Sequence, residues 1–149
     1  MAVLCDVNWL VALCCQAHQH HALACAWLEA GNGDKGLVVC RISQLGMLRL
    51  LTTPVLMKDD VCTTNTAWLV YDTMMSDSRF SYREEPLRLG RVLRALTKDY
   101  PFSPNLWQDA YLAAFAMTGD FSLITFDKGF RKFADLNCVV LPDDATLKI

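Results

Sequence analysis

Short apolar runs separate longer amphipathic segments along this chain, and the two kinds of segment predict different structures. The apolar runs are too short for helices and lack an alternating polar face, which is typical of strands that are buried on both faces of a sheet. A brief alternating run adds one further strand. The expected strands are Ala2–Val7, Leu37–Cys40, Phe80–Tyr82, Ser122–Phe126 and Cys138–Leu141.

The segments between these strands carry apolar residues at helical spacing. Capping residues mark several starts: Asn8 for the first helix and Asn105 for the helix that contains Asp109. The expected helices are Trp9–Cys15, His21–Ala30, Arg41 to Thr53-Pro54, Asp59–Met75, Leu87–Lys98, the helix after Asn105, and a short one at Lys128–Asp135. Strands that alternate with helices in this order predict an α/β sandwich on a mainly parallel sheet.

Composition narrows the class of protein. The 149 residues are 53% hydrophobic and 20% charged, which indicates one folded domain over residues 1–149 and excludes a disordered chain. No apolar run approaches the ~18 residues of a membrane span, and Asp6 interrupts an N-terminus without basic residues. We therefore expect a cytoplasmic protein with neither membrane segment nor signal peptide. A net charge of −2 means that a polyanionic partner would need a local basic patch.

The chain has seven cysteines, an odd number, and no CxxC pair. Most of them lie inside apolar runs. This pattern favours buried thiols in a reducing cytosol over a disulfide framework or a zinc site.

Three aspartates lie at the ends of apolar elements. Asp6 ends the first strand, Asp127 follows the strand Ser122–Phe126, and Asp109 lies in the first turn of a helix. Taken singly, Asp109 could serve the helix dipole and Asp127 a turn. Together at the carboxyl edge of one sheet they predict a site for Mg²⁺ or Mn²⁺, which prefer oxygen ligands and can activate water for attack on a phosphoryl group. The spacing alone fits a nuclease, a phosphatase or a phosphate-accepting receiver.

Three stretches, LCDVNWLVAL, CRISQLGMLRLLTTP and WQDAYLAAFAMTGDFSLITFDKGF, resemble the PIN-domain family, specifically the VapC-type toxin ribonucleases of toxin–antitoxin pairs. The resemblance extends from Leu4 to about Leu141. It implies a three-layer α/β/α sandwich with four to five strands in the sheet, and Mg²⁺- or Mn²⁺-dependent cleavage of RNA. It also implies neutralisation by a cognate antitoxin and assembly as a homodimer.

By the family's motifs, Asp6 matches the first acid, Asp109 the helix acid and Asp127 the acid after the fourth strand. The family's usual second acid is a glutamate, and Gln44 stands at its place. An amide oxygen can bind a hard cation but brings no charge, so we expect weaker metal affinity and one metal in preference to two.

Two other functions remain open at this point. A PIN-like domain that binds its antitoxin or RNA without efficient cleavage would explain Gln44, whereas the survival of all three carboxylates favours the nuclease. A receiver or a haloacid-dehalogenase-like phosphatase would require paired acids after the first strand. The sequence Asp6-Val7-Asn8 fits neither.

Several polar residues are candidates for supporting roles. Metal-site hydrogen bonds are expected from Asn8, Gln44 and Thr125, although Asn8 could equally be a plain helix cap. One helix face carries Arg91, Arg94 and Lys98, which could follow an RNA backbone or simply face solvent. Further basic candidates near the acidic edge are Arg41, Arg49, Arg131 and Lys132. The three histidines at positions 18, 20 and 21 are interpreted as a surface corner, with a role in substrate approach as the alternative.

Overall fold

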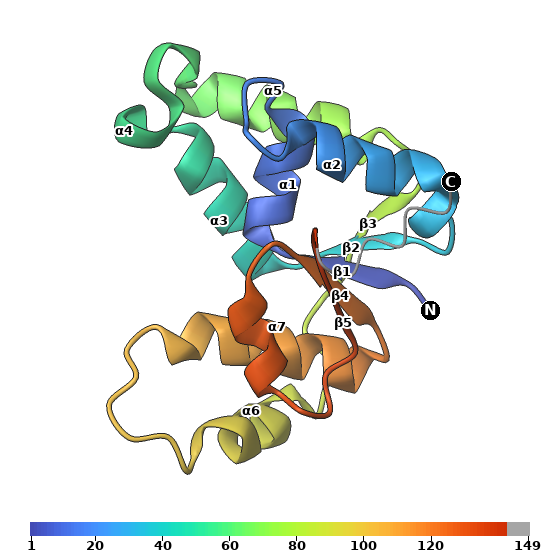
Figure 1. Cartoon of the computed structure of the whole chain (residues 1–149), viewed down its shortest axis with the longest axis vertical. Helices are drawn as coiled ribbons and strands as arrows, with labels where there is room; N and C mark the ends of the chain where they lie inside the picture. The colour runs from blue at the N-terminus through green and yellow to red at the C-terminus, as the bar shows by residue number, and fades with distance from the viewer. Residues whose placement is uncertain (143–149) are drawn as a thin grey trace.

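A five-stranded sheet forms the centre of the computed structural model, which describes residues 1–142 (Figure 1). All neighbouring strands are parallel, and their order across the sheet is β3-β2-β1-β4-β5. The strands are β1 (Val3–Cys5), β2 (Leu37–Val39), β3 (Phe80–Tyr82), β4 (Ser122–Thr125) and β5 (Cys138–Val140). Each of the five predicted strands is therefore confirmed, with small changes at its ends.

Helices cover both faces of this sheet and make the three-layer α/β/α sandwich that the sequence predicts. The first layer holds α1 (Val7–Cys14), α2 (His21–Trp27) with the π-helical η1 (Leu28–Asn32), α3 (Arg41–Leu51), α4 (Pro54–Met57), the 3-10 turn η2 (Lys58–Asp60) and α5 (Thr64–Met75). The second holds α6 (Leu89–Thr97), α7 (Leu106–Gly119) and the 3-10 turn η3 (Lys128–Lys132). Figure 1 shows these layers above and below the sheet.

Alternation along the strands divides the core between the two faces. In β1, Val3 and Cys5 pack with the α1–α5 layer, whereas Leu4 packs with α7. Large side chains such as Trp9 and Phe115 are fully buried on either side. The strands are thus buried on both faces, as their unbroken apolar runs indicate. No helix in residues 1–142 is long and apolar enough to cross a membrane.

Two local predictions are wrong. The helix expected at Asp59–Met75 begins only at Thr64, because Asp59 and Asp60 belong to η2 and Thr63 caps α5 by accepting a hydrogen bond from the Thr66 amide. The first helix begins at Val7, so Asn8 lies inside it and Asp6 is its N-cap.

The strand register brings functional side chains to one edge. Leu4 of β1 lies beside Val38 of β2 and beside Leu123 of β4. Continuing these registers by two residues places Asp6 level with Cys40 on one side and with Thr125 on the other. The three central strands therefore end together.

Candidate active site

Asp6 occupies the centre of the carboxyl edge of the sheet. Its side chain is only 6% exposed. Oδ1 accepts a hydrogen bond of 2.7 Å from the Val7 amide, and Oδ2 accepts one of 2.6 Å from the Thr125 hydroxyl. Burial raises the pKa of Asp6 to about 6, the two hydrogen bonds oppose that rise, and the charges of Asp109 and Asp127 add to it.

Thr125 joins several groups of the site. Besides donating to Asp6, its Oγ1 accepts a 2.9 Å hydrogen bond from the Asp127 amide. Asn8 lies beside it, with Nδ2 at 3.4 Å from Thr125 Oγ1 and Oδ1 accepting from the Phe126 amide at 3.2 Å. Asn8 and Thr125 thus have the supporting positions that the sequence suggests, while the capping role predicted for Asn8 belongs to Asp6.

The other two carboxylates come from the opposite layer and from the end of β4. Asp109 lies in the first turn of α7, where Lys132 Nζ forms an ion pair with its Oδ2 at 3.4 Å. Burial raises the pKa of Asp109, Lys132 opposes this, and Asp127 adds to it. Asp127 is exposed and caps η3, with Oδ1 accepting from the Gly129 amide at 2.7 Å. Asp6, Asp109 and Asp127 are called the acidic edge below.

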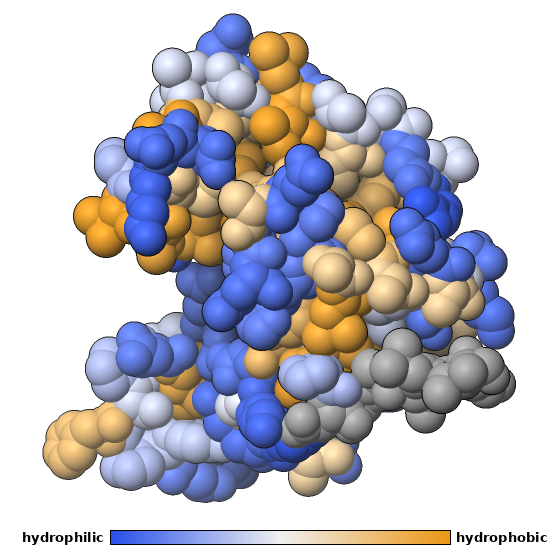
Figure 2. All heavy atoms as spheres, turned by 45° about the horizontal axis from the view of Figure 1, so that its top comes forward, coloured by the Kyte–Doolittle hydropathy of each residue, from blue (hydrophilic) through white to orange (hydrophobic). Residues whose placement is uncertain are grey.

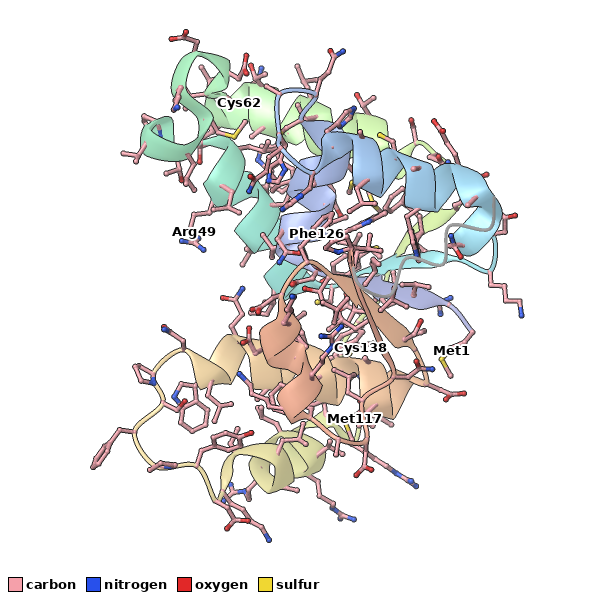
Figure 3. The ribbon with its side chains drawn as sticks, in the orientation of Figure 1. Met1, Arg49, Cys62, Met117, Phe126 and Cys138 are labelled. Carbon is pink, nitrogen blue, oxygen red and sulfur yellow. The ribbon has the colours of Figure 1, made fainter. Side chains whose placement is uncertain are left out.

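The carboxyl ends of the central strands face a hollow in the molecular surface (Figure 1, Figure 2). Figure 2 shows this hollow on the left of the molecule, between an upper and a lower lobe, with hydrophilic residues at its back. In Figure 1 the same side lies between α3 above and the start of α7 below. Figure 3 shows Phe126 at the centre of the molecule, where the chain leaves β4, and Arg49 extending from α3 toward this open side.

The donor set of the acidic edge suits a hard divalent cation. It offers carboxylate oxygens alone. Burial raises the pKa of Asp6 and Asp109, the neighbouring carboxylates add to that rise, and a bound cation would favour the charged forms against both effects. Among residues 1–142, no three histidine, cysteine, aspartate or glutamate side chains are close enough together to form a complete ligand set. Mg²⁺ commonly uses one or two carboxylates and keeps several waters, so it does not require three protein ligands around one point.

Gln44 is turned toward a neighbouring group of residues. Its side chain is buried on α3, its Oε1 accepts a hydrogen bond from the Arg41 guanidinium, and it also bonds to the Tyr71 hydroxyl. In the described part of the chain, no hydrogen bond joins Gln44 to the acidic edge.

The basic residues predicted for RNA binding lie in two different places. Arg91, Arg94 and Lys98 are exposed along α6 and its C-terminal end, in the lower helical layer of Figure 1. Lys132, by contrast, bonds directly to Asp109. The structure therefore brings Lys132 to the acidic edge and leaves the α6 residues on an outer surface.

The sequence analysis did not predict a contact between His20 and the end of β4, beside the acidic edge. The ring of His20 stacks on Phe126, with centroids 4.6 Å apart and an interplanar angle of 16°. Phe126 directly precedes Asp127. The histidine corner is thus a turn, as expected, and it also touches the rim of the site. Nothing in the spacing of two residues so far apart in the chain signals this contact.

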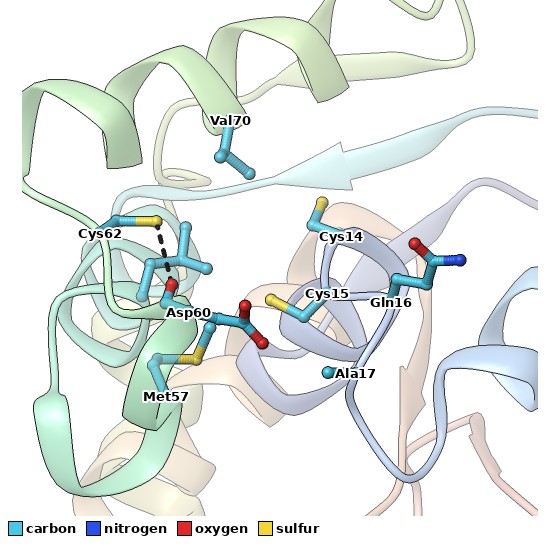
Figure 4. Close-up of a pocket in the computed structure, with 9 residues that line it drawn as sticks. Cys14, Cys15, Gln16, Ala17, Met57, Asp60, Cys62 and Val70 are labelled. Carbon is cyan, nitrogen blue, oxygen red and sulfur yellow. Dashed lines mark hydrogen bonds between the residues drawn. The ribbon is translucent and has the colours of Figure 1, made fainter.

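A sulfur-rich pocket of about 440 Å³ lies elsewhere, at the far end of α1 (Figure 4). Cys14, Cys15 and Cys62 line it, together with Asp60, whose carbonyl accepts from the Cys62 thiol. Since α1 rises about 1.5 Å per residue, this end is roughly 12 Å from Asp6. None of the seven cysteines, all of which lie in the described part of the chain, forms a disulfide, and Cys5 and Cys40 are fully buried.

Comparison with known proteins gives consistent results. The PIN domain family model matches residues 3–136, which include the whole acidic edge. Ribonuclease VapC41 of Mycobacterium tuberculosis is 35% identical over 143 residues, covering 93% of this chain and 98% of the relative. Ribonuclease VapC38 of the same species is 30% identical over 132 residues, covering 87% and 86%.

Solved structures resemble the fold at low sequence identity. VapBC2 from Rickettsia felis, bound to a DNA fragment from its promoter, has a TM-score of 0.69 at 14% identity and covers 94% of this chain and 98% of its own. VapC20 of Mycobacterium tuberculosis, a toxin that cleaves the sarcin-ricin loop, has a TM-score of 0.61 at 11% identity and covers 91% and 96%. These two likenesses concern the fold alone.

Proposed function

This chain belongs to the PIN domain family, and from that membership we propose that it is a metal-dependent endoribonuclease, the toxin of a toxin–antitoxin pair. The observation that carries the proposal is the acidic edge, where burial, with a smaller contribution from neighbouring carboxylates, raises the pKa of Asp6 and Asp109. Such an arrangement destabilises a fold unless it serves a ligand. We further propose that residues 1–149 form a single PIN domain.

Asp6, Asp109 and Asp127 are the residues that would hold Mg²⁺ or Mn²⁺. When bound, the cation polarises a phosphoryl oxygen and makes water a nucleophile at neutral pH. Hydrogen bonds within the protein orient the carboxylates. Thr125 and the Val7 amide fix both oxygens of Asp6, and the Thr125 hydroxyl also holds the Asp127 backbone. Lys132 balances the charge of Asp109.

The remaining assignments also rest on family membership. We propose that the protein acts in the cytoplasm on RNA, is neutralised by a cognate antitoxin and forms a homodimer. Arg91, Arg94 and Lys98 stay proposed contacts for the RNA backbone, since all three are exposed on α6. Sedimentation of the purified protein tests the homodimer, and co-purification with the product of an adjacent small gene tests the antitoxin.

The first experiment is cleavage of a panel of structured RNAs by the purified protein. It is run with Mn²⁺, with Mg²⁺ and with EDTA, beside an Asp6→Asn variant. We expect cleavage that requires the cation and disappears in the variant. A folded protein that cuts no RNA with either cation would overturn the nuclease proposal.

That second outcome would support a different function, a PIN-like domain that binds RNA or its antitoxin without efficient cleavage. The observation that favours it is Gln44, whose buried amide stands where the resemblance expects a carboxylate and bonds to Arg41 and Tyr71 instead. The two functions differ in turnover, so the same cleavage assay separates them.

A further inference from the structure

A second polar cluster lies beside the acidic edge, built around Arg41. Its guanidinium donates to Gln44 Oε1 and lies over the ring of Tyr82, with Cζ 4.9 Å from the ring centroid. Gln44 in turn bonds to the hydroxyl of Tyr71. Arg41, Gln44, Tyr71 and Tyr82 are called the arginine cluster below. They bring together α3, α5 and the end of β3.

The sheet register places this cluster next to Asp6. Asp6 follows β1 and Cys40 follows β2 at the same level, so Arg41 begins α3 one residue beyond the position beside Asp6. Neighbouring strands are about 4.8 Å apart, and the Arg41 guanidinium lies over Tyr82 at the end of β3, two strands from β1, so roughly 10 Å of the sheet edge separates it from Asp6. A strand of RNA with one phosphate at the acidic edge therefore has the phosphates of adjacent nucleotides within reach of the arginine cluster.

Two contacts hold the guanidinium of Arg41 in place, and other N–H groups of the side chain remain available to a ligand. Arg41 uses Nη1 for Gln44, and its face rests on Tyr82. The residue is nevertheless exposed to solvent. An arginine that is held by stacking and still has free N–H groups presents a planar donor fork, which matches phosphate oxygens.

No carboxylate of the described residues neutralises the positive charge of Arg41. Among residues 1–142, Arg41 forms no ion pair. Its hydrogen-bond partner Gln44 is uncharged. A glutamate at position 44 would instead place a buried negative charge against the guanidinium and cancel its attraction for an anion.

We propose that Arg41 binds a phosphate of the RNA next to the one at the acidic edge, and that Gln44 keeps the charge of Arg41 available for this contact. This inference deepens the proposed ribonuclease function and rests on it. With an amide instead of a carboxylate at position 44, the site lacks one possible metal ligand, but Arg41 keeps the positive charge that binds the phosphate.

The test is the salt dependence of RNA binding. A fluorescein-labelled single-stranded RNA of mixed sequence is titrated with the protein in EDTA, where the proposed cleavage does not proceed, at about 50 to 200 mM salt. The variants are Arg41→Gln, Arg41→Lys and Gln44→Glu. Lys35→Gln is the matched control, because Lys35 is exposed at the opposite end of β2. Circular dichroism verifies that each variant is folded.

Loss of one phosphate contact to a single strand lowers the slope of log K against log salt by about 0.7. We expect this decrease, with roughly 3- to 10-fold weaker binding at low salt, for Arg41→Gln. Gln44→Glu should show the same lowered slope, since the new carboxylate pairs with Arg41. Arg41→Lys should keep the slope, because it keeps the charge, and Lys35→Gln should leave both quantities unchanged.

Unchanged slope and affinity in Arg41→Gln would overturn the inference, as would absence of RNA binding by the wild-type protein in this titration. A slope that falls equally in Lys35→Gln would also overturn it, because the contact would then be a diffuse attraction. Failure of the ribonuclease proposal is a separate result: wild-type protein that binds RNA but does not cut it with Mn²⁺ or Mg²⁺.

Discussion

The hydroxyl of Thr125 lies 2.6 Å from Oδ2 of Asp6, although 119 residues separate the two along the chain. The same hydroxyl accepts from the Asp127 amide, so one buried threonine connects two of the three carboxylates of the acidic edge. The bond also lowers the pKa of Asp6, against the larger effect of burial. Thr125 therefore helps to orient the central acid and partly offsets the effect of burial on its pKa.

Replacing Thr125 with valine tests this relationship, because the shape is kept and the hydroxyl is lost. We expect roughly 1 to 3 kcal/mol lower stability, since polar groups of Asp6 and Asp127 lose their buried partner. The acidic limb of the pH profile of kcat/KM should move to higher pH, because the pKa of Asp6 rises further. Thr125→Ser should keep the wild-type profile. An unshifted limb in the valine variant would show that the hydroxyl does not act on Asp6.

The raised pKa of Asp6 predicts how the stability of the metal-free protein depends on pH. The ordinary pKa of an aspartate is about 3.9, and the folded state raises that of Asp6 to about 6. The folded state thus holds the proton more tightly, so this group lowers stability as pH rises from about 4 to 6, and the loss is complete above that range. A shift of roughly two units corresponds to about 3 kcal/mol.

Thermal unfolding of Asp6→Asn in EDTA measures this effect. At pH 8 the variant should melt several degrees above the wild type, because the buried charge is gone, and at pH 4 the difference should vanish. Added Mg²⁺ should stabilise the wild type at pH 8 and leave the variant nearly unchanged. If the variant melts below the wild type at pH 8, Asp6 is not a strained anion in the metal-free fold.

The sequence predicts well those features that depend on the residues of one short segment. The strands β1, β2 and β4 are apolar runs with no alternation, which by itself indicates burial on both faces. Parallel strands end at a common edge, so the meeting of Asp6 and Asp127 follows once the strands are placed. Asp109 entered the same prediction from its place in a first helical turn, where an aspartate is common for reasons of the helix dipole alone, and the family motif supports its assignment.

The features that the sequence did not predict depend on contacts between distant segments. Asp6 and Asn8 are both good helix caps, and the choice between them is made by Thr125 and the Phe126 amide, which hold the two side chains. The stack of His20 on Phe126 likewise joins separate segments. The prediction for the start of α5 was wrong for a local reason. Asp59 suits a helix start, but the chain turns through η2 first.

Gln44→Glu tests whether the missing carboxylate limits metal binding. We expect tighter Mn²⁺ binding in isothermal titration, because a fourth carboxylate would stand near the acidic edge. The increase in Mn²⁺ affinity should be smaller than an unpaired carboxylate would give, since Arg41 bonds to the side chain at position 44. Arg41→Gln combined with Gln44→Glu should therefore bind Mn²⁺ more tightly than Gln44→Glu alone. Unchanged or weaker Mn²⁺ affinity in both variants would mean that position 44 does not face the cation.

Gly46 of α3 tests how closely this helix must approach α1, and Gly90 of α6 is the matched control. A Cβ added at Gly46 would lie 2.4 Å from Cγ2 of Val7, the residue that follows Asp6 in the chain, whereas one added at Gly90 meets nothing within 4 Å. Overpacking of this kind typically costs about 1 to 3 kcal/mol. Gly46→Ala should therefore destabilise the protein in denaturant unfolding and also lower cleavage, because it displaces Val7 and with it the acid beside it.

Gly90→Ala is the control, since an alanine in the open face of α6 should be neutral or stabilise by roughly 0.5 to 1 kcal/mol. Its cleavage activity should equal that of the wild type. The activity of Gly46→Ala, measured at a temperature where the variant remains fully folded, separates the two effects. Normal activity in that folded variant would show that the position of Asp6 tolerates movement of Val7, and that close packing of α3 on α1 serves stability alone.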